Sequence, residues 1–539
     1  MSTRTRFPTA LFAFALVFGS GLLLAPRTAS AQFDLEVIYS EIASSPTSDV
    51  PGALDLAGQP AAAKFLSMLD LFASPTGDQW VLRGSTDQGS DLANFMILGV
   101  GDNGSMFAQE GQPVAGGVPG ELYEFFDGVG SFNSAGNFAY GARARAGDPT
   151  IKEKVIVFDG LNSTIVATES SPVTGLQDST GPAGDETLGN SLNSIHLLDN
   201  GSVGYVAVTI SNVSSANRPA LFYDLAAFAQ SGFTPIGADT WDGFDSNEFF
   251  TTADGLHWFA MGDTFTSPDV LAVDGAIVLS NGVVAPGTTD EVDAIFHTKM
   301  LPDGSWIARG DFADNTDWVV ADGVLIARTG DPIFPGSTES WSEVISSAYR
   351  APNGQTFIAG GTDSADPAAD LVLVELGNGV IAREGDPIDL DGNGVFDDDV
   401  FVRSFKPNSI FLEGGNLRFL ATLQNGLGDS LGDAFLRKTL VIADPIFSRG
   451  DCNGDGGFNI ADAIFLLGFL FPVGPPTTLS CDDACDANDD GGLNIADAIR
   501  ALEALFPGGT PMPLVAPFPG CGFDPTGDSL DCGSSPSCP

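Results

Sequence analysis

Two stretches near the C-terminal end repeat one spacing of polar residues. DCNGDGGFNIAD, from Asp451, and DANDDGGLNIAD, from Asp486, place oxygen-bearing side chains at positions 1, 3, 5, 9 and 12 and glycine at position 6. Short oxygen ligands at alternate positions converge on one hard cation, and the glycine allows the sharp turn that this needs. The spacing therefore predicts two calcium-binding loops of the EF-hand type.

The predicted ligands come from five side chains and one backbone carbonyl in each loop. Carboxylates this close together repel one another without metal, so metal binding should be coupled to folding. The ligands are Asp451, Asn453, Asp455, Asn459 and Asp462 in the first loop and Asp486, Asn488, Asp490, Asn494 and Asp497 in the second, with the carbonyls of Gly457 and Gly492 at position 7.

Each loop should lead directly into a helix. Asp462 and Asp497 begin helical patterns, where a carboxylate favours the positive end of the helix dipole. We expect the two apolar helix faces to pack against each other. Because so small a core is insufficient alone, the cations should supply folding energy. The expected faces are Ile460, Ile464 and Leu467 in one helix and Ile495, Ile499 and Leu502 in the other.

This paired loop-helix pattern resembles a type I dockerin module over residues 449–507. The resemblance implies calcium-dependent folding and attachment of a secreted protein, often a polysaccharide-degrading enzyme, to a cohesin partner. Many dockerins carry hydroxyl residues at loop positions 10 and 11. Here these positions hold Ile460 with Ala461 and Ile495 with Ala496, which puts the standard cohesin partner in doubt.

A third stretch, DLDGNGVFDDDV, begins like a calcium loop but lies in the middle of the chain. Asp389, Asp391, Asn393 and Asp397 fall on ligand positions, and no carboxylate stands at position 12. The stretch is interpreted either as a third calcium site or as a solvated acidic hairpin loop.

The long region before the paired loops repeats a turn glycine that is followed by an aromatic β-rich segment. The gaps between successive glycines are 49 to 65 residues, and each unit reads as four antiparallel strands. We predict a seven-bladed β-propeller, with an open β-solenoid or a string of sandwiches as the alternatives. The glycines are Gly77, Gly136, Gly201, Gly255, Gly304, Gly354 and Gly415.

Two segments compete for the strand that closes the last unit. EVIYSEIASSPTSDVPG near the N-terminal end resembles the fourth strands of later units, whereas TLVIADPIF follows the last unit directly. A closed ring would remove exposed sheet edges. One further stretch, AAAKFLSMLDLF, is expected to form a helical turn.

Asn133 to Tyr140, NSAGNFAY, resembles the NxxGxxAF tandem repeat of exported bacterial proteins, with tyrosine in place of phenylalanine. This resemblance covers residues 32–447 loosely and implies no activity. The sequence is thus divided into a signal peptide at 1–31, the repeat propeller at 32–447, the dockerin-like module at 448–509 and a cysteine-rich tail at 510–539.

Composition limits the partners and the compartment. The net charge of −48 repels phosphate backbones, so nucleic acid is excluded as a partner. The first 31 residues have arginines, a short apolar run and Ala29-Ser30-Ala31, which indicate a signal peptide, and no later stretch is long enough to span a membrane. All six cysteines follow Arg449, so we expect disulfides confined to that region, in a secreted or cell-surface bacterial protein.

Catalytic motifs occur without the surroundings that they need. GDSLG around Ser430 fits a nucleophile elbow, but all three histidines precede it. Acids such as Asp242, Asp245, Glu248 and Asp263 are too abundant for chance pairs to indicate a glycosidase. The sequence favours a non-enzymatic propeller that binds a partner or a glycan and is attached through its calcium-binding module. The alternative is a tethered polysaccharide-degrading enzyme, a glycosyl hydrolase or lyase.

Overall fold

The computed structural model describes most of the chain beyond the predicted signal peptide, which lies outside the described residues. Side chains at positions 128, 129 and 343 are not described. The described residues are 35–145, 153–177, 180–182, 184–214, 219–440, 447–472, 479–508, 513–522, 530, 532 and 538.

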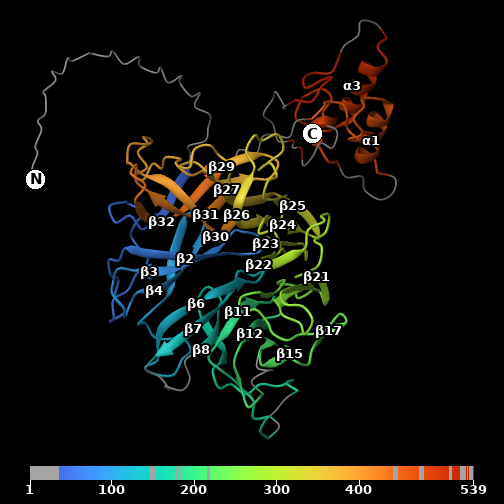
Figure 1. Cartoon of the computed structure of the whole chain (residues 1–539). Coiled ribbons are helices and arrows are strands. Elements are labelled where there is room, and N and C mark those ends of the chain that lie inside the picture. The colour runs from blue at the N-terminus through green and yellow to red at the C-terminus, as the bar shows by residue number, and fades with distance from the viewer. Residues whose placement is uncertain are drawn as a thin grey trace, which may run out of the picture.

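Seven four-stranded antiparallel sheets, the blades, follow one another along the described chain (Figure 1). Blade 1 contains β2 (Phe65–Ala73), β3 (Trp80–Thr86), β4 (Asn94–Val100) and β5 (Asn103–Gln109). Blade 2 contains β6 (Leu122–Phe132), β7 (Phe138–Arg145), β8 (Glu153–Phe158) and β9 (Ser163–Thr168). Blade 3 contains β11 (Leu192–Leu197), β12 (Val203–Ala207), β14 (Ala220–Tyr223) and β15 (Ala226–Gln230).

The remaining blades repeat this order. Blade 4 contains β18 (Phe249–Thr251), β19 (Trp258–Gly262), β20 (Val270–Val273) and β21 (Ala276–Ser280). Blade 5 contains β22 (Val292–Met300), β23 (Trp306–Phe312), β24 (Asp317–Ala321) and β25 (Val324–Arg328). Blade 6 contains β26 (Trp341–Arg350), β27 (Thr356–Thr362), β28 (Leu371–Glu375) and β29 (Gly379–Arg383). Two short ribbons, β10 (Thr187–Leu188) with β13 (Ile210–Ser211) and β16 (Pro235–Ile236) with β17 (Asp239–Thr240), lie in connections.

Blade 7 joins the two ends of the ring. It contains β30 (Phe401–Glu413), β31 (Asn416–Gln424) and β32 (Ser430–Thr439), and its fourth strand is β1 (Leu35–Ser40), which pairs antiparallel with β32. The N-terminal segment is therefore the closing strand. TLVIADPIF does not supply it, because Thr439 ends β32; residues 441–446 lie outside the described residues.

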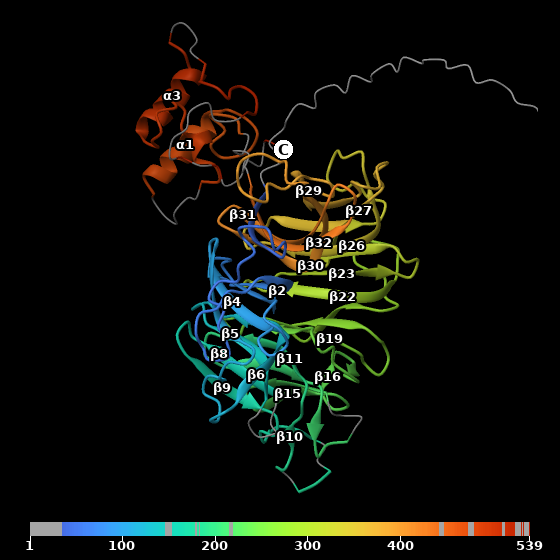
Figure 2. The ribbon, with the colours of Figure 1, turned by 90° about the vertical axis from the view of Figure 1, so that its left-hand side faces the viewer.

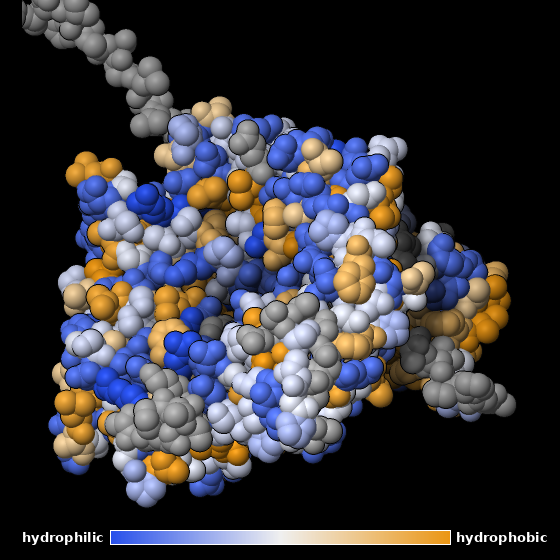
Figure 3. Space-filling model, turned by 60° about the horizontal axis from the view of Figure 1, so that its bottom comes forward, coloured by the Kyte–Doolittle hydropathy of each residue, from blue (hydrophilic) through white to orange (hydrophobic). Residues whose placement is uncertain are grey.

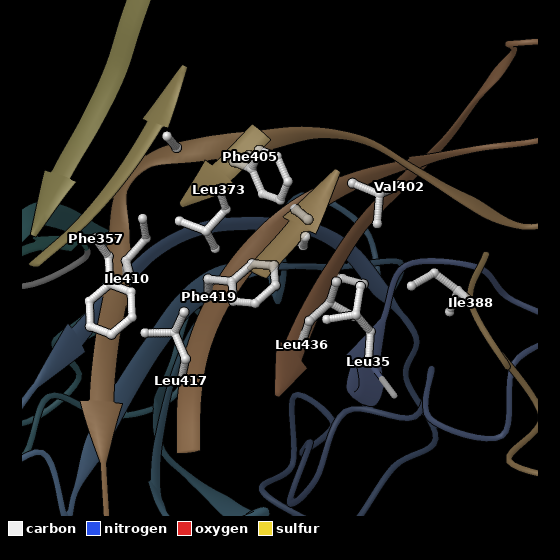
Figure 4. Close-up of a cluster of buried hydrophobic side chains, with 14 of the residues drawn as sticks. Leu35, Phe357, Leu373, Ile388, Val402, Phe405, Ile410, Leu417, Phe419 and Leu436 are labelled. Atoms are coloured by element: carbon white, nitrogen blue, oxygen red, sulfur yellow. The ribbon is translucent and has the colours of Figure 1, made fainter. Parts of the chain in front are cut away.

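Apolar packing between blades confirms the closed seven-bladed ring and excludes an open stack. Seven hydrophobic clusters each join two successive blades, and one of them joins blade 7 to blade 1. In that cluster Phe411 and Phe435 pack with Phe65 and Trp80. Figure 4 shows the cluster between blades 6 and 7, where Leu35 from β1 lies beside Leu436. Figure 2 shows the same succession of sheets from the side.

The turn glycines do what the repeat predicted. All seven adopt a positive φ, as at Gly304 with φ 83°. The Gly304 amide donates to the Leu301 carbonyl at 3.0 Å, and Trp306 then enters the core at the start of β23. A positive φ suits glycine because it has no Cβ, so this residue sets where each second strand begins.

Most of AAAKFLSMLDLF forms a strand, so the expected helical turn is wrong. Phe65 to Ala73 is β2, and its buried residues recur every third position around two register shifts with β3. The irregular strand imitates a helical period in the sequence, which explains the error.

The described C-terminal residues form a small α-helical module with α1 (Ile460–Leu470), α2 (Asp482–Cys485) and α3 (Ile495–Leu505). Disulfides Cys452–Cys485, Cys481–Cys532 and Cys521–Cys538 use all six cysteines and stay within this region, as predicted. The tail beyond 510 is joined to the module, since Leu514 and Phe518 pack in one of its clusters. Among the described residues, no helix has the length and apolarity needed to cross a membrane.

Candidate metal loops and the central cavity

The first predicted loop is folded around the carboxylate of Asp451. This side chain is buried, and its oxygens accept from the amides of Asp455 at 3.0 Å and Gly456 at 2.9 Å. Asp462, also buried, accepts from the Asn453 amide at 3.2 Å and the Asn459 amide at 2.8 Å. Positions 1 and 12 therefore lie inside the loop, bound to the backbone that encircles them.

The second loop repeats this arrangement residue for residue. Asp486 accepts from the amides of Asp490 at 3.3 Å and Gly491 at 2.9 Å. Asp497 accepts from Asn488 at 3.4 Å and Asn494 at 2.8 Å. Both carboxylates are fully buried, so each copy of the sequence spacing has produced the same geometry.

The residues at positions 9 and 12 also begin the helices. Asn459 and Asn494 are the N-caps of α1 and α3, and each forms a capping box with the aspartate three residues later. This reciprocal pair satisfies backbone amides at the helix start and holds each aspartate between loop and helix. The expected link between loop and helix is therefore present in the backbone geometry.

The donor set fits a hard cation. In the second loop the side-chain oxygen of Asn488, at position 3, is buried without a hydrogen-bond partner. Burial raises the pKa of Asp497 to about 6, and the neighbouring Asp486 carboxylate adds to the rise. Burial likewise raises the pKa of Asp462, with added repulsion from Asp451 and Asp455. Oxygen ligands of this kind favour calcium or magnesium over softer metals.

In each helix, the face that packs against the other helix lies next to the predicted face rather than on it. The contact between α1 and α3 buries Ala463, Leu466, Ala498 and Ala501, while Leu467 and Leu502 are only partly buried. The expected isoleucines instead face outward: Ile460, Ile464, Ile495 and Ile499 are 49, 61, 52 and 50% exposed. The small alanines allow the helices to approach closely and leave an isoleucine pair on the surface of each.

Arg449 connects the two loops, a role that sequence reasoning missed. Its buried guanidinium donates to the Asp486 carbonyl at 2.6 Å and pairs with Asp489 at 2.8 Å. It also donates to the Ala516 carbonyl at 3.0 Å. The arginine that precedes the first loop therefore bonds both the second loop and the tail.

The third candidate loop gathers a slightly different set of residues. Ligand atoms of Asp389, Asp391 and Asp398 lie within 4.8 Å of one another. Asp398 takes the place expected for Asp397, because its carboxylate turns inward to accept from the Leu390 amide at 2.7 Å. Asn393 lies beside them and donates to Asp391 at 3.0 Å.

The ring encloses a cavity of about 460 Å³ on its axis, which we call the central cavity. All seven innermost strands, β2, β6, β11, β18, β22, β26 and β30, contribute residues to its wall. The wall mixes aromatic rings such as Phe250 and Tyr349 with polar groups such as Lys299 and Asn408. Figure 3 shows one face of the molecule, where hydrophobic and hydrophilic side chains are interspersed.

Most charges on the cavity wall are paired. Asp70 pairs with Arg83 at 2.5 Å, and Arg350 pairs with Asp322 at 2.6 Å. Glu248 contacts the His297 Nδ1 atom at 2.7 Å.

Lys299 is the exception among these charges. Its ammonium lies 5.3 Å from the centre of the Tyr349 ring, and no ion pair or hydrogen bond of its ammonium is found among the described residues. Its surface faces the cavity, while the surrounding protein lowers its pKa to about 8 through burial.

The catalytic motifs of the sequence are not assembled into a site. Ser430 begins β32 opposite Gln424 in an exposed hairpin. Of the four acids considered, only Glu248 lines the central cavity. Burial, with repulsion from Asp269, Asp263 and Glu248, raises the pKa of Asp245 to about 6. The described residues thus include a carboxyl group that binds a proton near pH 6, but they do not form a nucleophile elbow beside it.

Comparison with known proteins supplies no family. No family model matches the chain, and no curated protein matches it. Among solved structures, the chain is similar to the β-propeller domain of the Trilobed protease from Pyrococcus furiosus, with 9% identity and a TM-score of 0.35 over 70% of this chain and 98% of that one.

Two further solved structures show how diverse the neighbours are. The WD40 β-propeller domain of Doa1 is 10% identical, with a TM-score of 0.32 over 70% of this chain and 93% of that one. Periplasmic gluconolactonase PpgL from Pseudomonas aeruginosa is 12% identical, with a TM-score of 0.31 over 75% and 95%. At such scores these likenesses carry no functional argument, and the propeller assignment rests on the strand pairing itself.

Proposed function

We propose that this is an exported calcium-binding protein whose propeller binds a ligand or partner and whose C-terminal module attaches it to another protein. Three disulfides in the module support export, because such bonds persist in oxidising compartments. The signal peptide predicted at 1–31 supports the same route.

The observation that carries the proposal is the duplicated loop. Each loop holds two buried carboxylates through backbone amides at equivalent positions. The side-chain oxygen of Asn488 is left without a hydrogen-bond partner. Burying like charges side by side is unfavourable unless a cation neutralises them. A bound calcium ion would supply that charge and accept the orphaned oxygen as a ligand.

Attachment is proposed to use the isoleucine pairs on α1 and α3. Exposed pairs of large apolar residues are unusual on so small a module, and here they occur twice in equivalent places. The partner would therefore present an apolar surface and would differ from a cohesin that reads hydroxyl residues at loop positions 10 and 11. Either copy of the surface could engage one partner.

Calcium titration of the full chain tests the metal sites. Calorimetry after chelator treatment should show two ions bound by the module. Asp451→Ala or Asp486→Ala should each remove one ion, whereas Asp366→Ala, which changes an exposed acid of the ring, should remove none. An unchanged stoichiometry in both loop variants would contradict the proposal.

Binding to an immobilised type I cohesin tests the partner. The wild-type chain should bind at least tenfold more weakly than a variant with Ile460→Ser and Ala461→Thr. Equal binding would show that these positions do not select the partner. Polysaccharide turnover by the full chain, abolished by one carboxylate change, would favour the tethered-enzyme alternative instead.

A further inference from the structure

The central cavity has the size and the wall of a small-molecule site. Its volume of about 460 Å³ falls within the range of roughly 300–1,000 Å³ typical of such sites. Aromatic rings from β18 and β26 provide apolar area, and a few polar groups between them could fix a ligand's orientation. All seven blades contribute to the wall, so a ligand here would contact the rigid centre of the ring.

Of the charged side chains on the cavity wall, that of Lys299 has no ion-pair partner among the described residues. Asp70, Glu248 and Arg350 each have a partner at 2.5 to 2.7 Å. Lys299 is half-buried, and its ammonium lies over the Tyr349 ring without a counter-ion. Partial loss of water makes an unpaired cation less favourable and favours an anion beside it. Lys299 therefore requires an explanation that packing alone does not provide.

A second polar group on the same wall also lacks a partner. The side-chain oxygen of Asn408 is buried and unbonded, and the residue adopts a positive φ of 57° inside an irregular part of β30. The Asn408 amide donates to Ser347, which lies on β26 two residues before Tyr349, the ring beneath the Lys299 ammonium. Strands β22, β26 and β30 thus bring an unpaired cation and a side-chain amide with an unbonded oxygen to neighbouring parts of the wall.

We propose that the central cavity binds a small organic acid of sugar-acid size, with Lys299 as the counter-ion of its carboxylate. The inference rests on the proposed role of the propeller as a binding body and names the ligand class. One ammonium acts as a point charge and suits one carboxylate, whereas a doubly charged phosphate would call for further cations. The Nδ2 group of Asn408, which lines the cavity, would donate to a hydroxyl of the same ligand, and the aromatic rings would cover its carbon skeleton. Burial lowers the pKa of Lys299, and a carboxylate bound beside its ammonium would raise that pKa again.

Calorimetry with glucuronate and with glucose tests the proposal on the full calcium-loaded chain. Glucuronate should bind at least tenfold more tightly than glucose, which has the same ring without the carboxylate. Lys299→Met keeps most of the side-chain length and should weaken glucuronate binding at least tenfold. Lys64→Met is the matched control, because this lysine lies outside the cavity wall and pairs with Asp49 at 2.7 Å, and it should change binding less than twofold.

Chemical protection gives an independent measurement. Acylation of Lys299, followed by mass spectrometry, should slow at least fivefold in the presence of glucuronate but not glucose. Equal affinity for the two sugars, unchanged binding by Lys299→Met, or no binding of glucuronate, gluconate or succinate at 10 mM would each overturn the proposal. Calcium stoichiometry measured on the same samples separates this failure from a failure of the proposed function.

Discussion

The ring and the C-terminal module are held together by different physical means. Clusters of the ring bury large side chains such as Trp80, Trp318 and Phe435 between blades. The module buries mainly alanines and disulfide cysteines, while its isoleucines remain on the surface. A core of small residues stabilises weakly, so cross-links and charge neutralisation must contribute more in the module.

This difference implies that the two regions should fail independently. Burial of apolar area does not depend on redox state or on metal, whereas the module contains three disulfides and the two proposed calcium loops. Changes that open the ring should leave calcium binding intact, and changes to cysteines or loop aspartates should leave the ring folded.

Removal of β1 should have the largest effect. A chain that begins at Ile42 lacks Leu35, Ile38 and Tyr39, whose burial contributes about 1.5–3 kcal/mol each for the aliphatic side chains. It also leaves the edge of β32 unpaired. Differential scanning calorimetry should show loss of the ring transition or a fall of more than 10 °C, with a chain that begins at Leu35 as the control. An unchanged ring transition would mean that closure contributes little.

Sequence reasoning identified the repeat but not its closure. Turn glycines are required by backbone geometry, so their spacing alone indicated seven blades. Strand propensity describes a segment and not its partner, so Leu35–Ser40 could not be distinguished from TLVIADPIF. The irregular pairing of β2 also concealed a strand behind an apparent helical period.

The candidate sites were likewise predictable from the sequence only in part. The folded geometry of the two loops was predictable because their polar residues lie within twelve residues of each other. The outward turn of Ile460 and Ile495 was not, since a helical period defines a stripe but not which neighbouring stripe meets the partner helix. Lys299 gave no signal at all, because its missing counter-ion becomes visible only when seven distant strands enclose one cavity.

Removal of the Cys452–Cys485 disulfide should come next in size. The bond joins residues 33 apart and connects the first loop to the end of α2. Replacing both cysteines with alanine should destabilise the module by about 2–5 kcal/mol, as for disulfides in small secreted domains. Chemical denaturation followed by helix circular dichroism measures the loss. The ring transition in the same sample should not move; a parallel shift of both would contradict independent folding.

Gly310→Ala should then reveal how tightly the ring is packed. An added Cβ would lie 2.0 Å from the Ala294 carbonyl oxygen and 2.5 Å from the Trp318 ring, so backbone must move. We expect a loss of about 1–3 kcal/mol from the ring transition. Gly508→Ala in the module is the matched control, since nothing lies within 4 Å of its added Cβ, and it should change stability by less than about 0.5 kcal/mol. Equal losses of stability in the two variants would show that the ring is not packed more tightly than the module at these positions.

Acidification should have a graded effect, small near neutral pH, and it concerns a buried histidine of the ring. His196 bonds the Ser194 carbonyl at 2.8 Å and Thr251 at 3.1 Å, and burial lowers its pKa from 6.5 to about 4. The unfolded chain therefore binds a proton that the folded ring rejects between these pH values. Stability is retained above pH 6.5 and falls as the pH drops toward 4, by about 2 kcal/mol at pH 5.

The histidine contribution can be isolated by comparing slopes rather than stabilities. Buried carboxyls with raised pKa values, such as Asp245 and Asp386, take up protons in the folded ring and act in the opposite direction on acidification. His196→Asn keeps a side-chain donor near Ser194 but cannot titrate, so the difference in slope from wild type between pH 4 and 6.5 belongs to His196. His257→Asn is the control, because this exposed histidine bonds Asp274 and has a raised pKa. Substitution of His257 should leave the loss of ring stability on acidification unchanged. If His196→Asn instead kept the wild-type slope of stability against pH, the buried imidazole would not be the group whose protonation the folded ring opposes.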